Sequence, residues 1–276
     1  MKRIVALGPK GTYCDVALDK YLKKINKNLE IAYYPSIFRV SDFMDDDTLA
    51  VIPFENTLDG FVIEGMDQII LNGYHIISQV KLDIDFAFVS YSKDIKNVKK
   101  IYVSFKALGQ CTKFISDYNF QTIKCDSNIE ALNSLNRWDE SYGAIIPMHS
   151  LDLDNLNYEL KIPHVADSKA NETRFFIVSK KKILEELDNE LEASIVITAK
   201  NDRPGILFDI LKSFHDLNIN LKSIMSRPMK TEMGQYRFYF ECSLFKNDIE
   251  LLDMLADMFK NSQDFILQIL GVYNKL

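Results

Sequence analysis

The chain has 276 residues, enough for about two domains. Its 47% apolar and 26% charged residues are typical of a soluble globular protein. Its 33 basic and 39 acidic residues give a formal net charge of −6, which argues against nucleic acid or anionic membranes as partners. The sequence has no apolar run near the roughly 18 residues of a membrane span and no signal-peptide core, so we expect a cytoplasmic protein.

The first part of the chain alternates short apolar runs with helical patterns. Residues 3–7 form an apolar run, and after a glycine turn at 8–11 apolar residues recur at helical spacing over 14–25. A second apolar run at 49–53 predicts a buried strand, and 61–71 predicts a second helix. This alternation is typical of an α/β domain.

A second group of elements predicts a second α/β lobe. Residues 73–90 are too dense in β-branched and aromatic residues for a surface helix, so they predict strands. The next predicted elements are strand 101–103, helix 106–115, strand 121–125, helix 127–136 and strand 143–146. A late strand at 173–178 is expected to return to the first lobe. We therefore expect one lobe of about 1–75 plus 165–180 and another of about 76–164.

The last part of the chain follows a different plan. The charged stretch 181–191 predicts a linker, either helical or irregular. The elements predicted beyond it are strand 193–199, helix 206–217, strands 219–226 and 235–242, a helix from 247, and strand 266–272. Asn247 followed by Glu250 has the form of a capping box at the start of the second helix. This βαββαβ order over 192–276 is typical of a ferredoxin-like unit.

Several motifs resemble one family. They are GPKGTYC at 8–14, PFENTLDG at 53–60, ALGQC at 107–111 and NETRFF at 171–176, spaced as in prephenate dehydratases, with RPGIL at 203–207 and SRPMK at 226–230 as in ACT regulatory domains. The resemblance implies an α/β catalytic domain over 1–180, built like the two-lobed type II periplasmic binding proteins. It also implies that the cleft between the lobes converts prephenate to phenylpyruvate in phenylalanine biosynthesis. Feedback control by phenylalanine at the ACT domains of a homodimer or homotetramer is the further implication.

This chemistry needs hydrogen-bond donors rather than a metal or a strong base. Loss of hydroxide and carbon dioxide makes the ring aromatic, so the enzyme must assist the leaving hydroxyl, hold the pyruvyl carboxylate and keep the ring dry. No cofactor is implied, and neither the four cysteines nor the four histidines have the spacing of a disulfide framework or a zinc site. We therefore expect no metal and no cofactor.

Residues 173–175 fit those needs in one tripeptide. The resemblance implies Thr173 as the proton donor to the leaving hydroxyl, while Arg174 either anchors a carboxylate or braces the site from behind. Phe175 would form a wall beside the ring. Because neighbours in a strand point to opposite faces, we expect Thr173 and Phe175 to share one face and Arg174 to take the other. The plain alternative is an ordinary strand with a surface arginine.

Further substrate contacts are expected around the same cleft. The candidates are Glu55, Asn56, Thr57, Gln110, Gly11, Thr12 and Ser104. Asn56 and Thr57 follow a buried strand, where ligand sites of α/β proteins cluster, whereas Glu55 would repel an anionic substrate and is better suited to orienting the loop. Gly11 and Thr12 precede a helix, whose start offers N–H groups to an anion, although a plain structural turn is the alternative. The resemblance implies that Gln110 contacts substrate from the opposite wall.

Three positions depart from the family pattern. Tyr13-Cys14 stands where Phe-Ser is usual, and Val103-Ser104-Phe105-Lys106 stands where Ser-His-Pro-Gln is usual, so a one-residue shift would let Ser104 supply the lost hydroxyl. Met225 replaces a glutamate of the ACT motif, which predicts weaker phenylalanine binding. The residues expected at the regulatory site are Pro204, Gly205, Ile206, Leu207, Met225, Ser226, Arg227 and Pro228.

Other functions stay open at this point. Related enzymes act on arogenate, or decarboxylate prephenate without making the ring aromatic, although Thr173 argues against the second chemistry. A third alternative is an amino-acid sensor without activity, because a two-lobed fold also serves binding proteins and a fold alone does not determine function.

Overall fold

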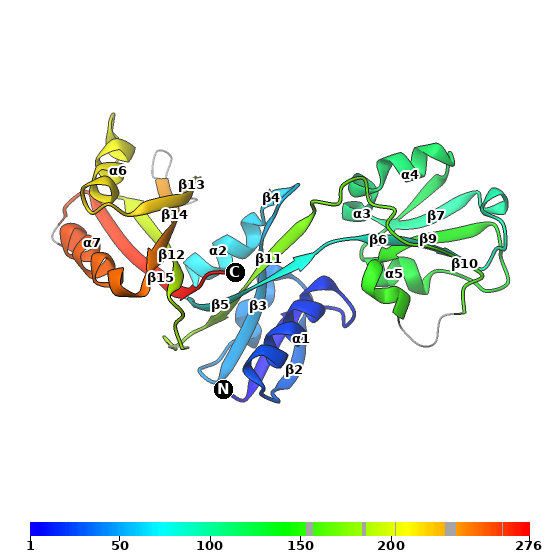
Figure 1. Ribbon diagram of the computed structural model, residues 1–276, viewed down its shortest axis with the longest axis horizontal. Coiled ribbons are helices and arrows are strands. Elements are labelled where there is room, and N and C mark those ends of the chain that lie inside the picture. Colours follow the sequence, from blue (N-terminus) through cyan, green and yellow to red (C-terminus); the bar gives the residue numbers. More distant parts are fainter. Residues whose placement is uncertain (153–156, 184–185, 202, 230–235, 261) are drawn as a thin grey trace.

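The computed structural model describes the whole chain except residues 153–156, 184–185, 202, 230–235 and 261. Its helices and strands form three units in a row (Figure 1), with the first lobe in the middle, the second lobe on one side and the C-terminal domain on the other. No helix among the described residues is long and apolar enough to cross a membrane.

The first lobe is built on one mixed sheet with the strand order β2-β1-β3-β11-β5 and the short β4 beside β3. Its strands are β1 (Arg3–Leu7), β2 (Glu30–Tyr34), β3 (Thr48–Asn56), β4 (Gly60–Phe61), β5 (His75–Asp83) and β11 (Glu172–Ser179). β1 is parallel to β2 and β3, whereas β11 runs antiparallel to both β3 and β5. The late strand therefore returns to the first lobe, as expected from the sequence.

Helices cover both faces of this sheet, because its strands are apolar on both sides. Helix α1 (Tyr13–Ile25) packs with Ile4 and Ala6 on one face, and α2 (Ile63–Leu71) packs with Val5 on the other, as the period of two in β1 requires. The segment between β2 and β3 contains the 3₁₀ helix η1 (Ile37–Phe43). One face thus continues toward the second lobe and the opposite face toward the C-terminal domain.

The second lobe is a five-stranded sheet with the order β10-β6-β9-β7-β8. Its strands are β6 (Phe86–Ser90), β7 (Lys100–Ser104), β8 (Gln121–Cys125), β9 (Tyr142–Pro147) and β10 (Leu160–Ile162). Its helices are α3 (Phe105–Gln110), α4 (Thr112–Asp117), α5 (Asn128–Asn133) and the 3₁₀ helices η2 (Ile95–Asn97) and η3 (Met148–Asp152). The single helix predicted over 106–115 is interrupted at Cys111, whose φ of −128° is not helical.

The boundary between the lobes differs from the expected one. β5 hydrogen-bonds to β11 in the sheet of the first lobe, so the crossing to the second lobe lies after Asp83 rather than at 76. The β-rich stretch at 73–90 is therefore two strands in two different sheets. Composition predicts that such a stretch is extended, whereas the sheet to which each strand belongs depends on the strand with which it pairs.

The C-terminal domain has the expected βαββαβ order. Its elements are β12 (Glu190–Ala199), α6 (Ile206–Asp216), β13 (Asn220–Pro228), β14 (Tyr236–Phe245), η4 (Lys246–Asp248), α7 (Glu250–Lys260) and β15 (Phe265–Asn274). The antiparallel sheet has the order β13-β14-β12-β15, and α6 and α7 cover one face of it. β12 begins within the predicted linker, and Asn247 lies in η4 rather than capping α7.

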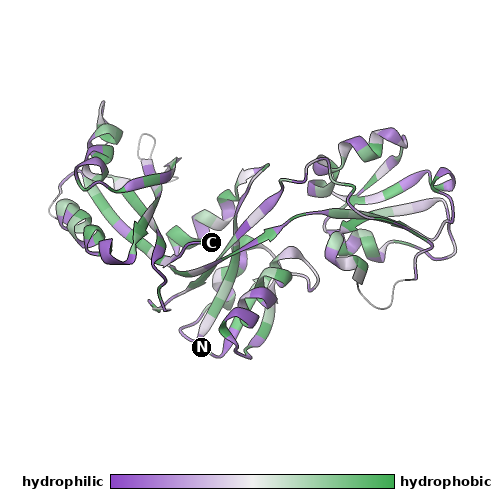
Figure 2. Cartoon of the chain, viewed as in Figure 1, coloured by the Kyte–Doolittle hydropathy of each residue, from purple (hydrophilic) through white to green (hydrophobic). Residues whose placement is uncertain are grey.

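The second face of the C-terminal sheet packs on the first lobe. Val196, Tyr239 and Tyr273 share one apolar cluster with Phe54 of β3 and Phe176 of β11. Figure 2 shows hydrophobic colour along the strands and hydrophilic colour on outward helix faces. The C-terminal sheet and the first lobe are thus joined by a common apolar core.

Candidate active site

A cavity of about 420 Å³ lies between the two lobes, a volume suited to a small-molecule ligand. The first lobe contributes Thr12, Asn56, Thr173 and Phe175 to its lining, among others, and the second lobe contributes residues that include Ser104, Lys106, Gln110 and Ser127. This cavity is called the cleft below. Its walls combine apolar rings with amides and hydroxyls.

The alternation of β11 divides the tripeptide as expected. Thr173 and the buried Phe175 line the cleft, while Arg174 lines a second cavity on the opposite side of the sheet. Arg174 is therefore not part of the cleft lining. This position is the one expected of a residue that braces the site from behind.

A bulge in β3 sets which side chains of residues 54–56 face the cleft. The β11–β3 register shifts between Arg174 and Phe175, so that Phe54 is an extra residue between the paired positions. Phe54 and Glu55 consequently both face the C-terminal domain, and Asn56 faces the cleft beside Thr173. Without the bulge, the period of two would turn Asn56 to the face of Phe54.

Asn56 holds the Thr173 hydroxyl. Its amide oxygen accepts hydrogen bonds from the backbone N–H groups of Leu58 and Asp59, both at 3.0 Å, which directs the amide nitrogen toward β11. Asn56 Nδ2 donates to Thr173 Oγ1 at 2.9 Å and to Asn171 Oδ1 at 2.7 Å. Because Thr173 Oγ1 is the acceptor in this bond, its own O–H remains for a partner in the cleft.

Gln110 joins the two walls of the cleft. Its Nε2 donates to Asp59 Oδ2 of the first lobe at 3.3 Å, and its Oε1 accepts from Asn171 Nδ2 at 2.9 Å. Gln110 is buried and lines the cleft, as expected from the sequence. A chain of amides thus connects Asp59 with Thr173 through Gln110, Asn171 and Asn56.

Two serines of the second lobe cap helices at the cleft. Ser104 Oγ accepts from the N–H of Ala107 at 3.3 Å and donates to Asn128 Oδ1 at 2.6 Å. Ser127 Oγ accepts from the N–H of Glu130 at 3.0 Å and so caps α5. Both serines line the cleft, so Ser104 combines a structural bond with a position beside the ligand space.

Two predicted contacts, Glu55 and Thr57, lie outside the cleft lining. Glu55 pairs with Arg174 on the opposite face, with 2.7 Å between the Glu55 Oε2 and Arg174 Nη2 atoms. Thr57 donates to the carbonyl of Ala170 at 2.8 Å and accepts from the N–H of Glu172 at 2.9 Å. Thr57 therefore fastens the returning segment to β3.

The glycine turn before α1 is partly engaged within the chain. Gly11 has a φ of +89°, its N–H donates to Asp15 at 2.9 Å, and it does not line the cleft. Thr12 does line the cleft, but its hydroxyl donates to the Leu7 carbonyl at 3.1 Å. No side chain caps α1 at Thr12. The backbone N–H groups in the first turn of α1 are therefore the donors that this turn offers to an anion.

Lys106 lines the cleft, although the sequence analysis does not name it as a site residue. Among the described residues that line the cleft it is the one cation, and the carboxylates of Asp59, Glu64 and Asp126 line the same cavity. The sequence shows that Lys106 departs from the family pattern at 103–106. That this lysine is the cation of the cleft follows only from the structure, in which Arg174 lies on the opposite side of the sheet.

Cys14 is a neutral group in the cleft wall. Burial raises the pKa of its thiol from 9.0 to about 12, and the nearby charge of Lys106 lowers it only in part. Cys111 is also buried, and burial raises its pKa to about 12. Neither thiol is ionised near neutral pH, so neither acts as a nucleophile there.

The predicted regulatory residues occupy one end of the C-terminal sheet. Arg227 of β13 is in register with Arg237 of β14, which is in register with Thr198 near the end of β12. The 203–207 turn follows β12 at this end, and Gly205 has the positive φ of +85° at the start of α6. Met225 is half-buried against the shared core, and Arg227 Nη2 lies 2.9 Å from Asp67 Oδ2 of α2.

Two family models match the chain. The model described as prephenate dehydratase matches residues 4–183, and the model described as ACT domain matches residues 193–253. A curated relative, the prephenate dehydratase of Methanocaldococcus jannaschii, is 33% identical over 276 residues, which cover 99% of this chain and 98% of that protein. The match therefore extends over both the lobes and the C-terminal domain.

Solved structures share this architecture. A prephenate dehydratase from Staphylococcus aureus subsp. aureus Mu50 superposes with a TM-score of 0.79 at 28% identity, covering 99% of this chain and 100% of that one. A prephenate dehydratase from Arthrobacter aurescens in complex with L-Phe superposes with a TM-score of 0.82 at 24% identity, covering 99% and 90%. The expected fold, a two-lobed α/β domain followed by an ACT domain, is confirmed.

Proposed function

The chain belongs to the prephenate dehydratase family and is an enzyme, and we propose that prephenate binds in the cleft between its lobes and leaves it as phenylpyruvate. The observation that carries this proposal is the Thr173 hydroxyl, which accepts a bond from Asn56 and keeps its own proton for a ligand. It lies in a cavity of about 420 Å³ beside the Phe175 ring.

In this reaction the prephenate dianion takes up one proton and gives the phenylpyruvate anion, carbon dioxide and water. The bond from the ring to its carboxylate breaks, and the electron pair enters the ring. The C–O bond across the ring breaks in turn, and the leaving oxygen departs as water. A donor placed at that oxygen stabilises the charge that develops on it.

Thr173 supplies this donor. A threonine hydroxyl is a very weak acid, so it acts as an oriented hydrogen-bond donor while solvent provides the proton that water carries away. Asn56 fixes the orientation, because its amide is held by two backbone N–H groups. Phe175, 1% exposed, keeps that side of the ring dry, which leaves the departing carboxylate without stabilising hydration.

Lys106 would hold the pyruvyl carboxylate. A bound dianion needs positive charge, and Lys106 is the cation that the described cleft residues offer. It projects from the start of α3 on the second lobe, opposite Thr173 on the first. Substrate held between them would draw the lobes together, with Gln110 already bonded to Asp59 across the gap.

The test of the reaction is product identification. Purified protein is incubated with prephenate, and products are identified by mass and by the absorbance of phenylpyruvate. Thr173→Val should lower kcat by about 100-fold or more, as loss of a transition-state donor does, whereas Thr173→Ser keeps the hydroxyl and most of the activity. No phenylpyruvate from the wild-type protein, or a valine variant as active as wild type, would contradict the proposal.

Arogenate is a second candidate substrate. Asp59, Glu64 and Asp126 line the cleft, and carboxylates would favour the ammonium that arogenate carries in place of the keto group of prephenate. The ratio of kcat/KM for prephenate to kcat/KM for arogenate shows which of the two substrates the enzyme prefers. Product masses also separate dehydration from decarboxylation without loss of water, and ligand binding without turnover would indicate a sensor.

Phenylalanine is the effector that we propose for the C-terminal domain, since a solved relative of the same fold is a complex with L-Phe. The candidate residues are Pro204, Gly205, Ile206, Leu207, Met225, Ser226, Arg227 and Pro228. Met225 is half-buried against the apolar core that the C-terminal sheet shares with the first lobe, so a ligand at this position would lie beside the domain interface. Calorimetry should show tighter phenylalanine binding by Met225→Glu than by the wild type, and the reverse order would contradict this role.

A homodimer or homotetramer is the assembly that we propose. β13 is an edge strand of the C-terminal sheet, and Phe208 and Ile224 of this domain are 68% and 45% exposed. Open edges and exposed apolar side chains favour association. Light scattering during gel filtration would give the mass, and a monomer would contradict the assembly. The cytoplasmic location stays a prediction from sequence.

A further inference from the structure

We infer that Arg174 is a positioning residue through which the C-terminal domain holds Thr173 in its catalytic orientation. The inference rests on the proposed function of Thr173 and extends it across the domain boundary. The set of side chains that carries it is called the interdomain ion cluster and consists of Arg174, Glu55, Glu192, Lys222 and Glu241. Glu192 and Glu241 belong to the C-terminal sheet, on β12 and β14.

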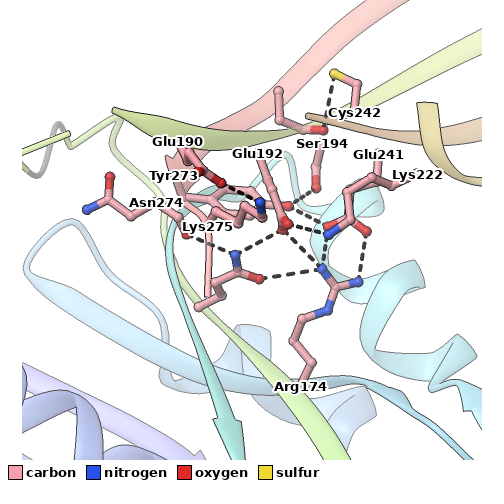
Figure 3. A network of polar contacts seen from close by, with 12 residues as sticks. Arg174, Glu190, Glu192, Ser194, Lys222, Glu241, Cys242, Tyr273, Asn274 and Lys275 are labelled. Atoms are coloured by element: carbon pink, nitrogen blue, oxygen red, sulfur yellow. Dashed lines mark hydrogen bonds and ion pairs between the residues drawn. The ribbon is translucent and has the colours of Figure 1, made fainter. Parts of the chain in front are cut away.

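The geometry around Arg174 is that of a clamp (Figure 3). Both terminal nitrogens of its guanidinium bond to the carboxylate of Glu241, with Nη2 2.8 Å from Oε2 and Nη1 bonded to Oε1. Nη2 also lies 2.7 Å from Glu55 Oε2 of β3. The Arg174 Cζ atom lies 5.3 Å from the ring centroids of both Phe54 and Phe176, so the plane of the fork is held by packing as well as by charge.

The centre of the cluster is buried, whereas the side chains of Glu55 and Lys222 at its edge are 36% and 38% exposed. The side chains of Arg174, Glu192 and Glu241 are 13%, 3% and 2% exposed. The Tyr273 hydroxyl donates to Glu241 Oε1 at 2.8 Å, and Lys222 pairs with Glu192. Although burial opposes its charge, Glu241 holds the pKa of Arg174 above its ordinary value, so the guanidinium stays protonated.

The charges are not balanced within the cluster. Three carboxylates face two cations, and Arg174 is the cation that three of these acids share. A shared buried cation keeps the acids from repelling one another, so the side chain of Arg174 is drawn toward the C-terminal sheet from a fixed place on β11. Any shift of β14 relative to the first lobe therefore changes the force on this strand.

The strand passes that force directly to the cleft. Thr173 precedes Arg174 on β11 and pairs with Asn56 in the β3 register, while Arg174 pairs with Glu55. Both side chains of the first pair line the cleft, and both side chains of the second pair belong to the cluster. The C-terminal sheet also touches the neighbouring strand, since Gln79 of β5 donates to the carbonyl of Asn274 at 2.9 Å. The orientation of the catalytic hydroxyl thus depends on contacts made on the far face of the same two strands.

Glu241→Gln and Glu192→Gln form a matched pair for the test. The two glutamates are 1% and 2% exposed, and each substitution keeps the shape of the side chain. Glu241 makes two close bonds to Arg174, whereas the nearest Glu192 oxygen is 3.5 Å from Arg174 Nη1. Asp67→Asn is the control for an interdomain ion pair that does not involve β11.

We expect Glu241→Gln to lower kcat for prephenate about tenfold with KM within about twofold, Glu192→Gln to lower kcat less, and Asp67→Asn to leave both constants unchanged. Hydrogen exchange, followed by mass spectrometry on peptides covering 54–57 and 171–176, should accelerate in the same order. Arg174→Lys, which keeps the charge and loses the fork, should resemble Glu241→Gln.

A merely structural role predicts a different pattern. Both buried glutamines would then lower the melting temperature alike and leave kcat of the folded enzyme unchanged, and this result would overturn the inference, as would equal exchange in all variants. If the wild-type protein does not turn over prephenate, the proposed function fails by itself. The order of the exchange rates would still decide whether the cluster positions Thr173.

Discussion

Lys106 is the residue whose replacement tests the electrostatics of the cleft most directly. It is the cation among the described cleft residues, so Lys106→Met leaves a dianionic substrate facing Asp59, Glu64 and Asp126 without compensation. A hydrogen bond to a charged group contributes about 1.5–3 kcal/mol, and every 1.4 kcal/mol is about tenfold in affinity. Because Lys106 is exposed, solvent screens it, and we expect the lower end of this range.

The measurement is the KM for prephenate in steady-state assays at low and high salt. KM should rise about tenfold in Lys106→Met, with kcat changed much less, because the lost contact binds the ground state and the transition state alike. Salt should raise the KM of the wild type, because it screens the attraction to Lys106, and should not raise the KM of the variant, in which only repulsion from the carboxylates is left to screen. Lys106→Arg keeps the charge and should stay within about threefold of wild type.

Lys113 provides a matched control on the same lobe, because it lies on α4 and does not line the cleft. Lys113→Met should leave KM unchanged. A KM for Lys106→Met equal to that of the wild type at low salt would refute the reasoning, and it would move the carboxylate site to the backbone N–H groups at the start of α1.

The remaining predictions concern stability. Gly271→Ala should destabilise the protein by about 1–3 kcal/mol as overpacking does, because a Cβ at Gly271 would lie 2.0 Å from the carbonyl oxygen of Ile76. Gly109→Ala is the control, because a Cβ at Gly109 would meet open space. Equal melting temperatures of the Gly271→Ala variant and the wild type would contradict the close approach. Stability should also decline between about pH 9 and 12: burial raises the pKa of Cys14 and Cys111 from 9.0 to about 12, so the unfolded state loses protons first and gains stability as pH rises. Urea unfolding at several pH values measures this, and Cys111→Ala should show a shallower decline than wild type; identical slopes would count against the pKa shift.

The predicted helices and strands agree best with the structure where the sequence pattern that predicts them is local. The strand at 3–7 and the strand at 121–125 have the bounds that their apolar runs predict, and the βαββαβ order of the C-terminal domain is confirmed. β2 was not predicted, since Glu30–Tyr34 is polar at one end and is defined by its pairing with β1. The sequence analysis also predicts one helix over 106–115, although Gly109 lies two residues before the break at Cys111.

The candidate site divides in the same way. Thr173, Asn56, Gln110, Thr12 and Ser104 line the cleft as expected, because residues at strand ends and helix starts of α/β lobes gather between them. Phe175 lines it too, whereas Arg174, Glu55, Thr57 and Gly11 lie on the other face or outside the lining. Alternation along β11 separates Thr173 from Arg174, and this much follows from the period of a strand.

The amino-acid sequence by itself determined the family, the order of the elements and the hydroxyl that the chemistry needs, since these follow from local patterns and from motifs. The tertiary structure decided which side chains line the cleft and which contact the C-terminal sheet. A bulge at Phe54 turns Asn56 into the cleft and Glu55 away from it, and the docked C-terminal sheet gives Arg174 its partner Glu241, 67 residues away along the chain. Register and docking depend on partners distant in the chain, which no local pattern encodes.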